Sequence, residues 1–379
     1  MLRRNFLSRL GLGFAALGLP TISFSQNKQT ETIPPMNPIK SIKALGFQWE
    51  TADPFLFCVH HEDFFPKGND QMGPTTSMEG RHMGSDFIIK DGFRMYHGQT
   101  VPGFPGHPHR GFETITVVRK GLVDHADSMG AAGRYGDGDV QWMTAGKGVQ
   151  HSEMFPLLHK DKENTMELFQ IWLNLPKKNK MVEPHFKMLW SDTIPTLKHT
   201  DNNAKTTLVE IIAGSISSTK ASTPPPNSWA ADPHNEVAVW NIKIEAGGNW
   251  TLPKASEGIN RTLYFYEGDT LTVAETLVNR YNAIEVDATV ELTLLAGNLE
   301  ASILVLQGRP INEPVIQYGP FVMNTKEEIQ QAFNDYHETQ FGGWPWKRLD
   351  QVHDREKGRF ALHADGREER RPFLSASSR

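Results

Sequence analysis

The sequence predicts an all-β protein made of two domains, each a β-sandwich or a β-barrel. Short apolar runs alternate with turns, and the 32 glycines and 24 prolines suit many short strands better than helices. Helical periodicity is missing through residue 320. The 379 residues are enough for two domains with separate cores.

The amino-acid composition excludes some classes of function and some kinds of metal site. With 38% hydrophobic and 22% charged residues the chain has ordinary globular usage, and its net charge of −5 offers no basic surface for binding nucleic acid directly. Cys58 is the single cysteine, so an intramolecular disulfide and a thiolate-rich metal site are both excluded. Any metal must therefore be bound by nitrogen and oxygen atoms.

Residues 1–25 resemble a twin-arginine export signal. Arg3 and Arg4 precede a weakly apolar stretch, and small residues at 23–25 offer a cleavage site before Gln26. The apolar stretch is too short to span a bilayer, which takes about 20 residues. We therefore expect a periplasmic or secreted protein without stable membrane insertion. The alternatives are an ordinary secretory signal or a frayed amphipathic N-terminus.

The first domain is expected over residues 41–178, after a polar linker at 26–40. Its clearest strands are apolar runs bounded by turn residues, at 46–50, 55–59, 114–118 and 168–175. Pro176 and the lysines that follow it mark the boundary with the second domain.

The second domain is expected over residues 179–325. Its strands are predicted at 208–213, 237–244, 261–266, 290–295 and 302–307. A stiff proline-rich insertion occupies 215–228. Thr325 and Glu328 form a capping box ahead of a helix at 327–336, within a C-terminal part, 326–379, whose charged tail we expect to be solvated and partly disordered.

Two short motifs carry the chemistry. His107 and His109 are separated by one residue, and so are His151 and Glu153. Side chains two apart on a strand point to the same face, so each pair can direct both members into one cavity. One such histidine alone would more simply line a loop, but four ionisable groups in one apolar cavity are costly without a cation. The pattern therefore predicts a metal site.

The residues around these motifs, 103–114 and 138–154, resemble the pirin family of iron-binding bicupins, and 313–325 resembles the segment that closes the second pirin domain. The resemblance covers about residues 40 to 340. It implies two stacked β-barrels, with one Fe(II) in the first held by His107, His109, His151 and Glu153. Some pirins are similar to quercetin 2,3-dioxygenases, and others are partners of transcription factors.

Ligand type restricts the metal. Imidazole with carboxylate suits iron, manganese, nickel, zinc or copper, whereas magnesium and calcium prefer oxygen ligands throughout. Four protein ligands on a six-coordinate ion leave two positions open. The choice of Fe(II) rests on the resemblance alone.

Glu113 is the alternative carboxylate. It keeps strand parity with His107 and His109, and it points inward if the strand runs unbroken. Many other cupins place their carboxylate ligand at this position, whereas the pirin resemblance favours Glu153 and leaves Glu113 beside the site or structural.

Three other groups of residues need an interpretation. The large side chains near the ligands, Phe104, Phe112, Trp142 and Met143, either line the cavity or pack in the core. The polar cluster at 58–63 includes the adjacent His60 and His61, which would face opposite ways on a strand, and we interpret it as a surface loop. His234 and Glu236 repeat the pattern of one pair only, so we expect the second barrel to hold no metal.

These observations predict an exported Fe(II)-dependent dioxygenase that opens the ring of a flavonol or a related phenolic substrate with O₂. Glu153 would alternate between metal ligand and catalytic base. One alternative is a metal-dependent redox-sensing module that is read by a protein partner and has no turnover. The other is a manganese-type cupin oxidase, for which Glu113 as a ligand would be the telling sign.

Overall fold

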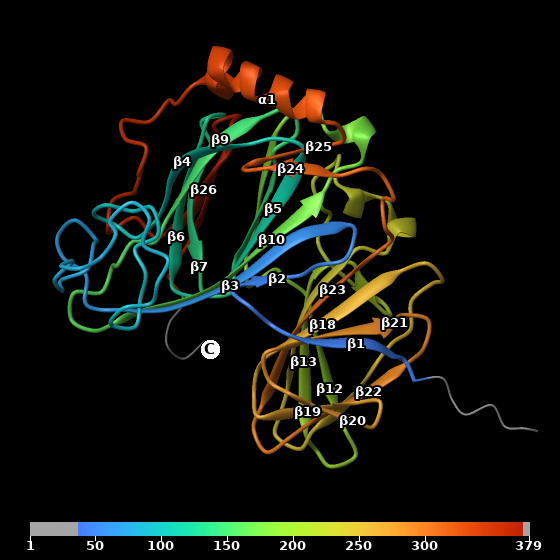
Figure 1. The fold of residues 1–379 in the computed structure, drawn as a ribbon. Coiled ribbons are helices and arrows are strands. Elements are labelled where there is room, and N and C mark those ends of the chain that lie inside the picture. Colours follow the sequence, from blue (N-terminus) through green and yellow to red (C-terminus); the bar gives the residue numbers. More distant parts are fainter. Residues whose placement is uncertain (1–36, 374–379) are drawn as a thin grey trace, which may run out of the picture. The chain divides into compact units, whose positions relative to one another are not determined.

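The computed structural model describes residues 37–373, which fold as two antiparallel β-barrels with one C-terminal α-helix, α1 (Lys326–Thr339) (Figure 1). The predicted all-β bicupin fold is confirmed. The expected export signal at 1–25 lies outside the described residues. Among the described helices, none is long and apolar enough to cross a membrane.

The first barrel is formed by two six-stranded sheets. One sheet has the order β11 (His185–Leu189), β8 (Val140–Thr144), β5 (Phe112–Lys120), β10 (Asn164–Asn174), β3 (Phe55–Phe65), β2 (Gln48–Trp49). The other has the order β27 (Glu368–Arg371), β26 (Arg359–Leu362), β7 (Ala132–Gly136), β6 (Leu122–Asp127), β9 (Val149–Met154), β4 (Gly103–His109).

The second barrel pairs a seven-stranded sheet with a four-stranded one. The larger sheet has the order β1 (Ile39–Ala44), β21 (Asn282–Asp287), β18 (Asn260–Glu267), β23 (Ala301–Gly308), β16 (Ala238–Ile244), β13 (Thr206–Ala213), β12 (Thr196–Thr200). The smaller has the order β17 (Asn249–Leu252), β22 (Leu292–Ala296), β19 (Thr270–Val273), β20 (Thr276–Asn279). Short hairpins are formed by β14 (Ser215–Ile216) with β15 (Thr219–Lys220), and by β24 (Ile316–Tyr318) with β25 (Phe321–Met323).

The first strand of the described chain belongs to the second barrel, and its last strands belong to the first barrel. β1 pairs with β21 of the second barrel, so the expected linker to residue 40 ends at the start of a strand. β26 pairs with β7 of the first barrel, and the expected disordered tail is therefore wrong for the described residues. One charge of the tail is buried in an ion pair: Arg359 binds both oxygens of Asp139, at 2.6 and 2.8 Å.

The barrels share one apolar core. It is formed by the outer face of the β3–β5–β8–β10 sheet and by side chains of β13, β16, β18 and β23, and it includes Trp142, Phe169, Tyr264 and Leu304. The sheet of the first barrel is therefore covered on both faces. This explains why Leu168–Leu175 reads as a nearly continuous apolar run instead of an alternating one.

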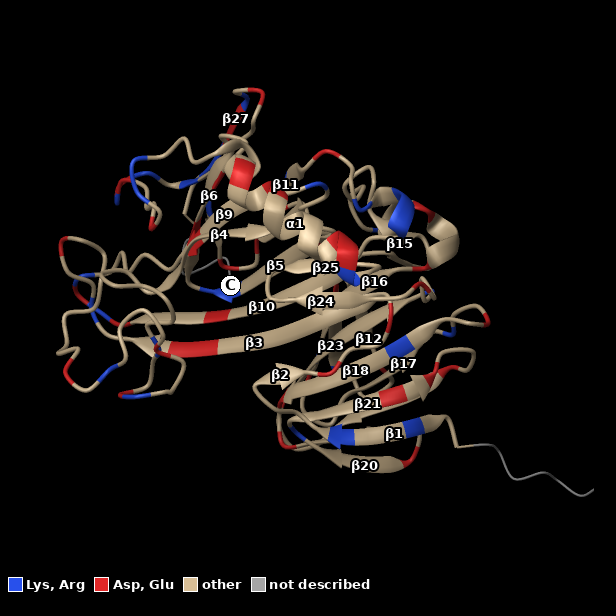
Figure 2. Cartoon of the chain, turned by 45° about the horizontal axis from the view of Figure 1, so that its top comes forward, with Lys and Arg blue, Asp and Glu red and all other residues tan. Residues whose placement is uncertain are grey.

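Helix α1 lies across one end of the first barrel (Figures 1 and 2). The predicted capping box of Thr325 and Glu328 is present. Asp335 pairs with Arg110 at 2.6 Å, and the Tyr336 hydroxyl donates to Gln150 of β9 at 3.0 Å. Figure 2 also shows acidic and basic residues interspersed along loops and strand ends.

Candidate metal centre

Three histidines meet inside the first barrel. His107 and His109 lie on β4, and His151 lies on β9 directly opposite His107 in the strand register. One ring nitrogen from each lies within 4.8 Å of the others. The expected convergence of the two motifs is therefore present for all three histidines.

Hydrogen bonds orient two of the rings. Nδ1 of His107 lies 2.9 Å from the carbonyl of Pro105, and Nδ1 of His109 lies 3.4 Å from the carbonyl of Pro320. Each Nδ1 therefore carries the proton, which leaves the Nε2 lone pair free to bind a metal. Pro320 belongs to the hairpin segment at 313–325, so that segment supports the site from outside the barrel.

Of the three histidines, His151 has the fewest hydrogen bonds to its ring nitrogens. It is fully buried, and neither of its ring nitrogens has a hydrogen-bond partner within residues 37–373. Buried polar groups without partners are costly, and a cation bound by the three imidazoles would remove that cost. The donor set thus fits a transition metal.

Burial keeps these imidazoles neutral. It lowers the pKa of His107 and holds the pKa values of His109 and His151 well below their usual range, and the neighbouring histidines act in the same direction on His109 and His151. Neutral imidazole is the form that binds a metal, so protons compete weakly for these nitrogens near neutral pH.

Glu153 lies beside the three histidines and is held by other strands. Its Oε2 is 3.9 Å from Nε2 of His151. The Thr116 hydroxyl donates to Oε1 at 2.7 Å, and the Gln170 amide donates to Oε2 at 2.7 Å. Tyr135, whose pKa is raised well above its usual value by burial and by the charge of Glu153, keeps its proton and lies 3.4 Å from Oε1. The carboxylate thus has one face toward the histidines and three donors behind it.

Glu113 faces away from the histidines. Gly111 separates β4 from β5 with φ of +88°, and a Cβ there would lie 2.0 Å from the carbonyl oxygen of Val322. This break reverses the parity that an unbroken strand would have kept. The Glu113 carboxylate accepts hydrogen bonds from Thr144 and Ser228 between the two barrels, and burial raises its pKa to about 7.

A third pair with the same spacing was not recognised in the sequence. His125 and Asp127 lie on β6 opposite Glu153 and His151, and the His125 ring is 5.5 Å from that of His151. Nε2 of His125 lies 3.1 Å from Asp127, whereas its Nδ1 has no hydrogen-bond partner in the part of the chain that the structure describes. The spacing of His-Ala-Asp was the available signal.

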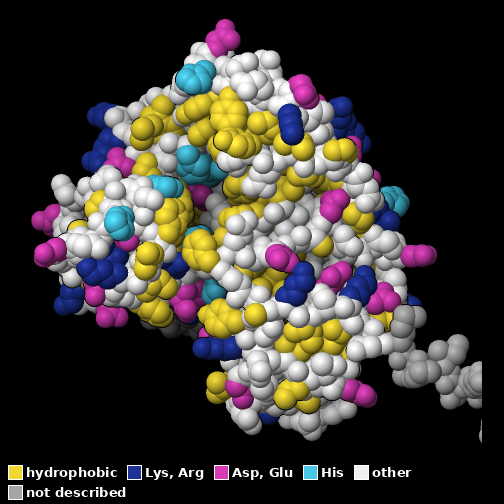
Figure 3. Space-filling view, in the orientation of Figure 1, with side chains coloured by type: hydrophobic (Ala, Val, Ile, Leu, Met, Phe, Trp, Pro, Cys, Tyr) yellow, Lys and Arg dark blue, Asp and Glu magenta, His cyan; other side chains and the backbone are white. Residues whose placement is uncertain are grey.

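Aromatic rings surround the histidines. Phe112 and Trp172 lie 5.1 and 5.4 Å from the His109 ring, and Phe104 lies 6.3 Å from the His107 ring. Met143 packs in the first barrel with Val149, whereas Trp142 faces the shared core between the barrels. Figure 3 shows a hollow on this face, with histidine and acidic side chains inside it and hydrophobic side chains on both flanks.

Two other sequence interpretations need comment. The expected surface loop at 58–63 is wrong, because these residues lie in β3, with His61 on the face toward the first-barrel interior and His60 on the opposite face. His234 lies on a 3₁₀ turn and is 93% exposed. The interior of the second barrel is filled by aliphatic and aromatic side chains.

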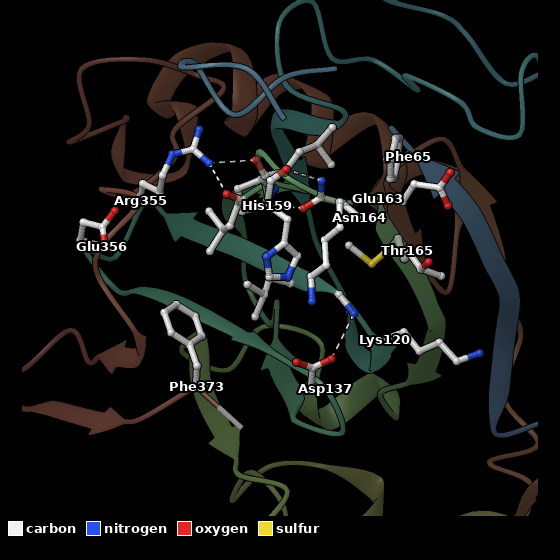
Figure 4. Close-up of a pocket in the computed structure, with 17 residues that line it drawn as sticks. Phe65, Lys120, Asp137, His159, Glu163, Asn164, Thr165, Arg355, Glu356 and Phe373 are labelled. Carbon is white, nitrogen blue, oxygen red and sulfur yellow. Dashed lines mark hydrogen bonds between the residues drawn. The ribbon is translucent and has the colours of Figure 1, made fainter. Parts of the chain in front are cut away.

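A separate pocket of about 560 Å³ lies at the end of the first barrel that is opposite to helix α1 (Figure 4). It is lined by Lys120, Asp137, Asn164 and Phe373, among others. Arg355 at its edge is engaged by the carbonyls of Leu157, Leu158 and Asn69, so its guanidinium is structural.

Fold and site together define a bicupin whose first barrel carries three histidines that could hold a metal ion. Two family models match the chain: "Pirin" over residues 65–173 and "Pirin C-terminal cupin domain" over 239–342. The chain belongs to the pirin family. Strands β26 and β27 lie beyond the matched residues.

Relatives and solved structures agree with this assignment. A Pseudomonas aeruginosa protein named "Putative quercetin 2,3-dioxygenase" is 36% identical over 269 residues, which are 69% of this chain and 88% of the relative. Pirin-1 of Arabidopsis thaliana is 35% identical over 63% of this chain and 78% of its own length. A crystal structure of quercetin 2,3-dioxygenase from Acinetobacter baumannii has a TM-score of 0.63 at 27% identity, covering 81% of this chain and 99% of that one.

Proposed function

We propose that this chain is an Fe(II)-dependent dioxygenase that opens the ring of a flavonol or a related phenol. The observation that carries the proposal is the buried group of three neutral imidazoles, in which His151 has no hydrogen-bond partner among the described residues. The similarity to proteins named as quercetin 2,3-dioxygenases supports the choice of reaction.

The metal, when bound, would supply Lewis acidity and the redox chemistry for O₂. His107, His109 and His151 would hold it, with Glu153 as the fourth ligand in the proposed set. The phenolic proton needs an acceptor, and the Glu153 carboxylate is the ionisable group best placed to take it. Thr116, Gln170 and Tyr135 would keep the carboxylate in position while it does so.

The surrounding walls support a flat aromatic substrate. Phe104, Phe112 and Trp172 lie beside the histidines, and the partly exposed rings of Phe104 and Trp172 offer faces and edges for stacking. They also exclude water from the reacting carbon atoms.

The test combines metal analysis with oxygen uptake. Iron-loaded protein should consume O₂ with quercetin, and His151→Ala should lose about 10-fold or more in metal affinity together with turnover, because a direct ligand matters at least as much as its supporting residues. His234→Ala, at an exposed histidine of the second barrel, is the matched control and should behave as wild type. An iron-loaded wild type that leaves O₂ untouched with every flavonol and simple phenol tried would contradict the proposal.

The other two candidate functions are less well supported. Glu113 as a ligand would be the sign of a manganese-type oxidase, but the Glu113 carboxylate accepts hydrogen bonds from Thr144 and Ser228 between the barrels. A redox-sensing module without turnover needs no open route to the metal, whereas Figure 3 shows a hollow that contains histidine side chains.

We also propose that the protein acts outside the cytoplasm, after export through the twin-arginine pathway. Support comes from the sequence at 1–25 alone. That pathway carries folded proteins, so the metal could be loaded before export.

A further inference from the structure

A chain of buried polar groups ends at His61, on the face of β3 toward the first-barrel interior. Nδ1 of His61 lies 2.8 Å from the Tyr96 hydroxyl, and that hydroxyl lies 2.5 Å from Oδ2 of Asp63. Arg94 donates to both oxygens of Asp63, from Nε at 3.0 Å and from Nη2 at 3.0 Å. His61 is only 5% exposed, and Tyr96 and Asp63 are fully buried.

The direction of each hydrogen bond follows from the donors available. Asp63, paired with the guanidinium of Arg94, can only accept, so Tyr96 uses its single proton to donate to Asp63. The Tyr96 oxygen must then accept from His61, which places the imidazole proton on Nδ1. The remaining nitrogen, Nε2, is therefore an acceptor.

The Nε2 acceptor of His61 is free to bind a ligand. Nε2 of His61 has no hydrogen-bond partner among the described residues. This nitrogen is also not completely shielded from solvent. Burial, with help from Arg94 and His60, lowers the pKa of His61 to about 3, so the ring stays neutral and keeps its free lone pair across the physiological range.

His61 lies at an edge of its sheet, on the face toward the first-barrel interior. β2 pairs only with Val59 and Cys58, so at His61 β3 is the edge of its sheet, and β4 is the edge of the opposite sheet. Phe104 of β4 bridges the two edges: its ring is 6.0 Å from His61 and 6.3 Å from His107. On its other side His61 contacts Phe47, which is half exposed.

We propose that His61 is a substrate-binding residue, whose Nε2 accepts a hydrogen bond from a hydroxyl group on the part of a polyphenol that lies away from the metal. This inference rests on the proposed function, because it assumes that a phenolic ligand occupies the cavity. It assigns the chain a preference for polyhydroxylated aromatic ligands over those that carry only the metal-chelating oxygens. Tyr96, Asp63 and Arg94 are positioning residues that fix the tautomer.

The first test measures the tautomer of His61 directly and needs neither substrate nor catalytic turnover. Protein labelled with ¹⁵N-histidine should show His61 protonated at Nδ1, with no change between pH 5.5 and 8, and Tyr96→Phe should shift it toward the other tautomer because the accepting hydroxyl is gone. A protonated Nε2 in the wild type would overturn the inference.

The second test compares two probes on metal-loaded protein: quercetin, and 3-hydroxyflavone, which keeps the chelating oxygens and lacks the other hydroxyls. His61→Leu should weaken quercetin binding about 5-fold and leave 3-hydroxyflavone binding unchanged, because one hydrogen bond is lost. His61→Gln, which retains an acceptor, should recover part of the loss. His60→Gln, on the opposite face of β3, should change neither affinity.

The outcomes separate this inference from the proposed function. Equal effects of His61→Leu on both probes, or none on either, would overturn the role of His61 while turnover by the wild type still stood. Selective loss of quercetin binding in a protein that consumes no O₂ would support His61 and contradict the dioxygenase. Failure of the metal-loaded wild type to bind either probe would overturn both. Should His61→Leu fail to fold, Tyr96→Phe replaces it and should weaken quercetin binding selectively.

Discussion

Glu113 and Glu153 lie in the same barrel and have opposite surroundings. Glu153 faces the three histidines with Thr116, Gln170 and Tyr135 behind it, whereas Glu113 is enclosed between the barrels. Replacing each with glutamine preserves size and removes a charge. The two variants therefore separate a metal-site carboxylate from a structural one.

We expect Glu153→Gln to bind iron about 10-fold or more weakly and to lose turnover, because the proposed fourth ligand and the candidate base are removed together. Glu113→Gln should keep its metal and most of its activity. Metal titration of both proteins, followed by oxygen uptake with quercetin, measures this. The reverse pattern would show that Glu113, and not Glu153, is the carboxylate ligand.

Glu113 should also give stability an unusual pH dependence. Its folded-state pKa is raised from 4.5 to about 7, mainly by burial, so between these values the folded protein keeps a proton that the unfolded chain has lost. Its contribution is fully present below about pH 4.5 and is lost as pH rises through 7, a fall of roughly 3 kcal/mol.

Chemical denaturation at pH 5 and pH 8 checks this contribution. The free energy of unfolding of Glu113→Gln should decrease less over this interval than that of the wild type. Glu183→Gln, at a side chain that is 78% exposed, is the control and should follow the wild type. Parallel curves for all three proteins would contradict the assignment.

At the scale of elements, β26 and β27 bind the C-terminal tail to the first barrel through buried charge. Arg134 is fully buried, pairs with Asp124 and donates to the carbonyls of residues 353, 354, 355 and 357 in the tail. Arg359 bridges β26 to Asp139, and both side chains are at most 2% exposed. The tail is thus part of the barrel that carries the three histidines.

Arg359→Met should lower the free energy of unfolding by about 3–5 kcal/mol, because it leaves Asp139 buried without its partner. Arg367→Met is the matched control: Arg367 is in the same tail, pairs with Glu369 and is 58% exposed, so its loss should cost less than about 1 kcal/mol. Urea denaturation of the two variants measures the difference. Equal stabilities would show that the tail contributes little to the barrel.

At the scale of the whole molecule, the export proposal can be tested apart from the fold. Replacing both Arg3 and Arg4 with lysine should retain the precursor in the cytoplasm, because twin-arginine recognition depends on the guanidinium pair and not on charge alone. Cell fractionation with N-terminal sequencing should find a wild-type mature chain that begins near Gln26. Continued export of the double variant would contradict the assignment.

The sequence by itself determined the barrel class and the three histidines. Both are local properties: turn residues separate the strands, and the spacing of His107 and His109 places them on one face whatever the strand pairs with. Most predicted strands and the capped helix occur where the pattern placed them. The pirin resemblance, and not spacing, favoured Glu153 over Glu113.

The tertiary structure decided what depends on distant parts of the chain. Parity survives only within an unbroken strand, and the turn at Gly111 directs Glu113 toward the second barrel. The donors to Glu153, the pairing of the charged tail with β7, and the fixed tautomer of His61 each join residues far apart in the sequence. Pattern within a segment carries no information about such partners, because their contacts form only when the sheets close into a barrel.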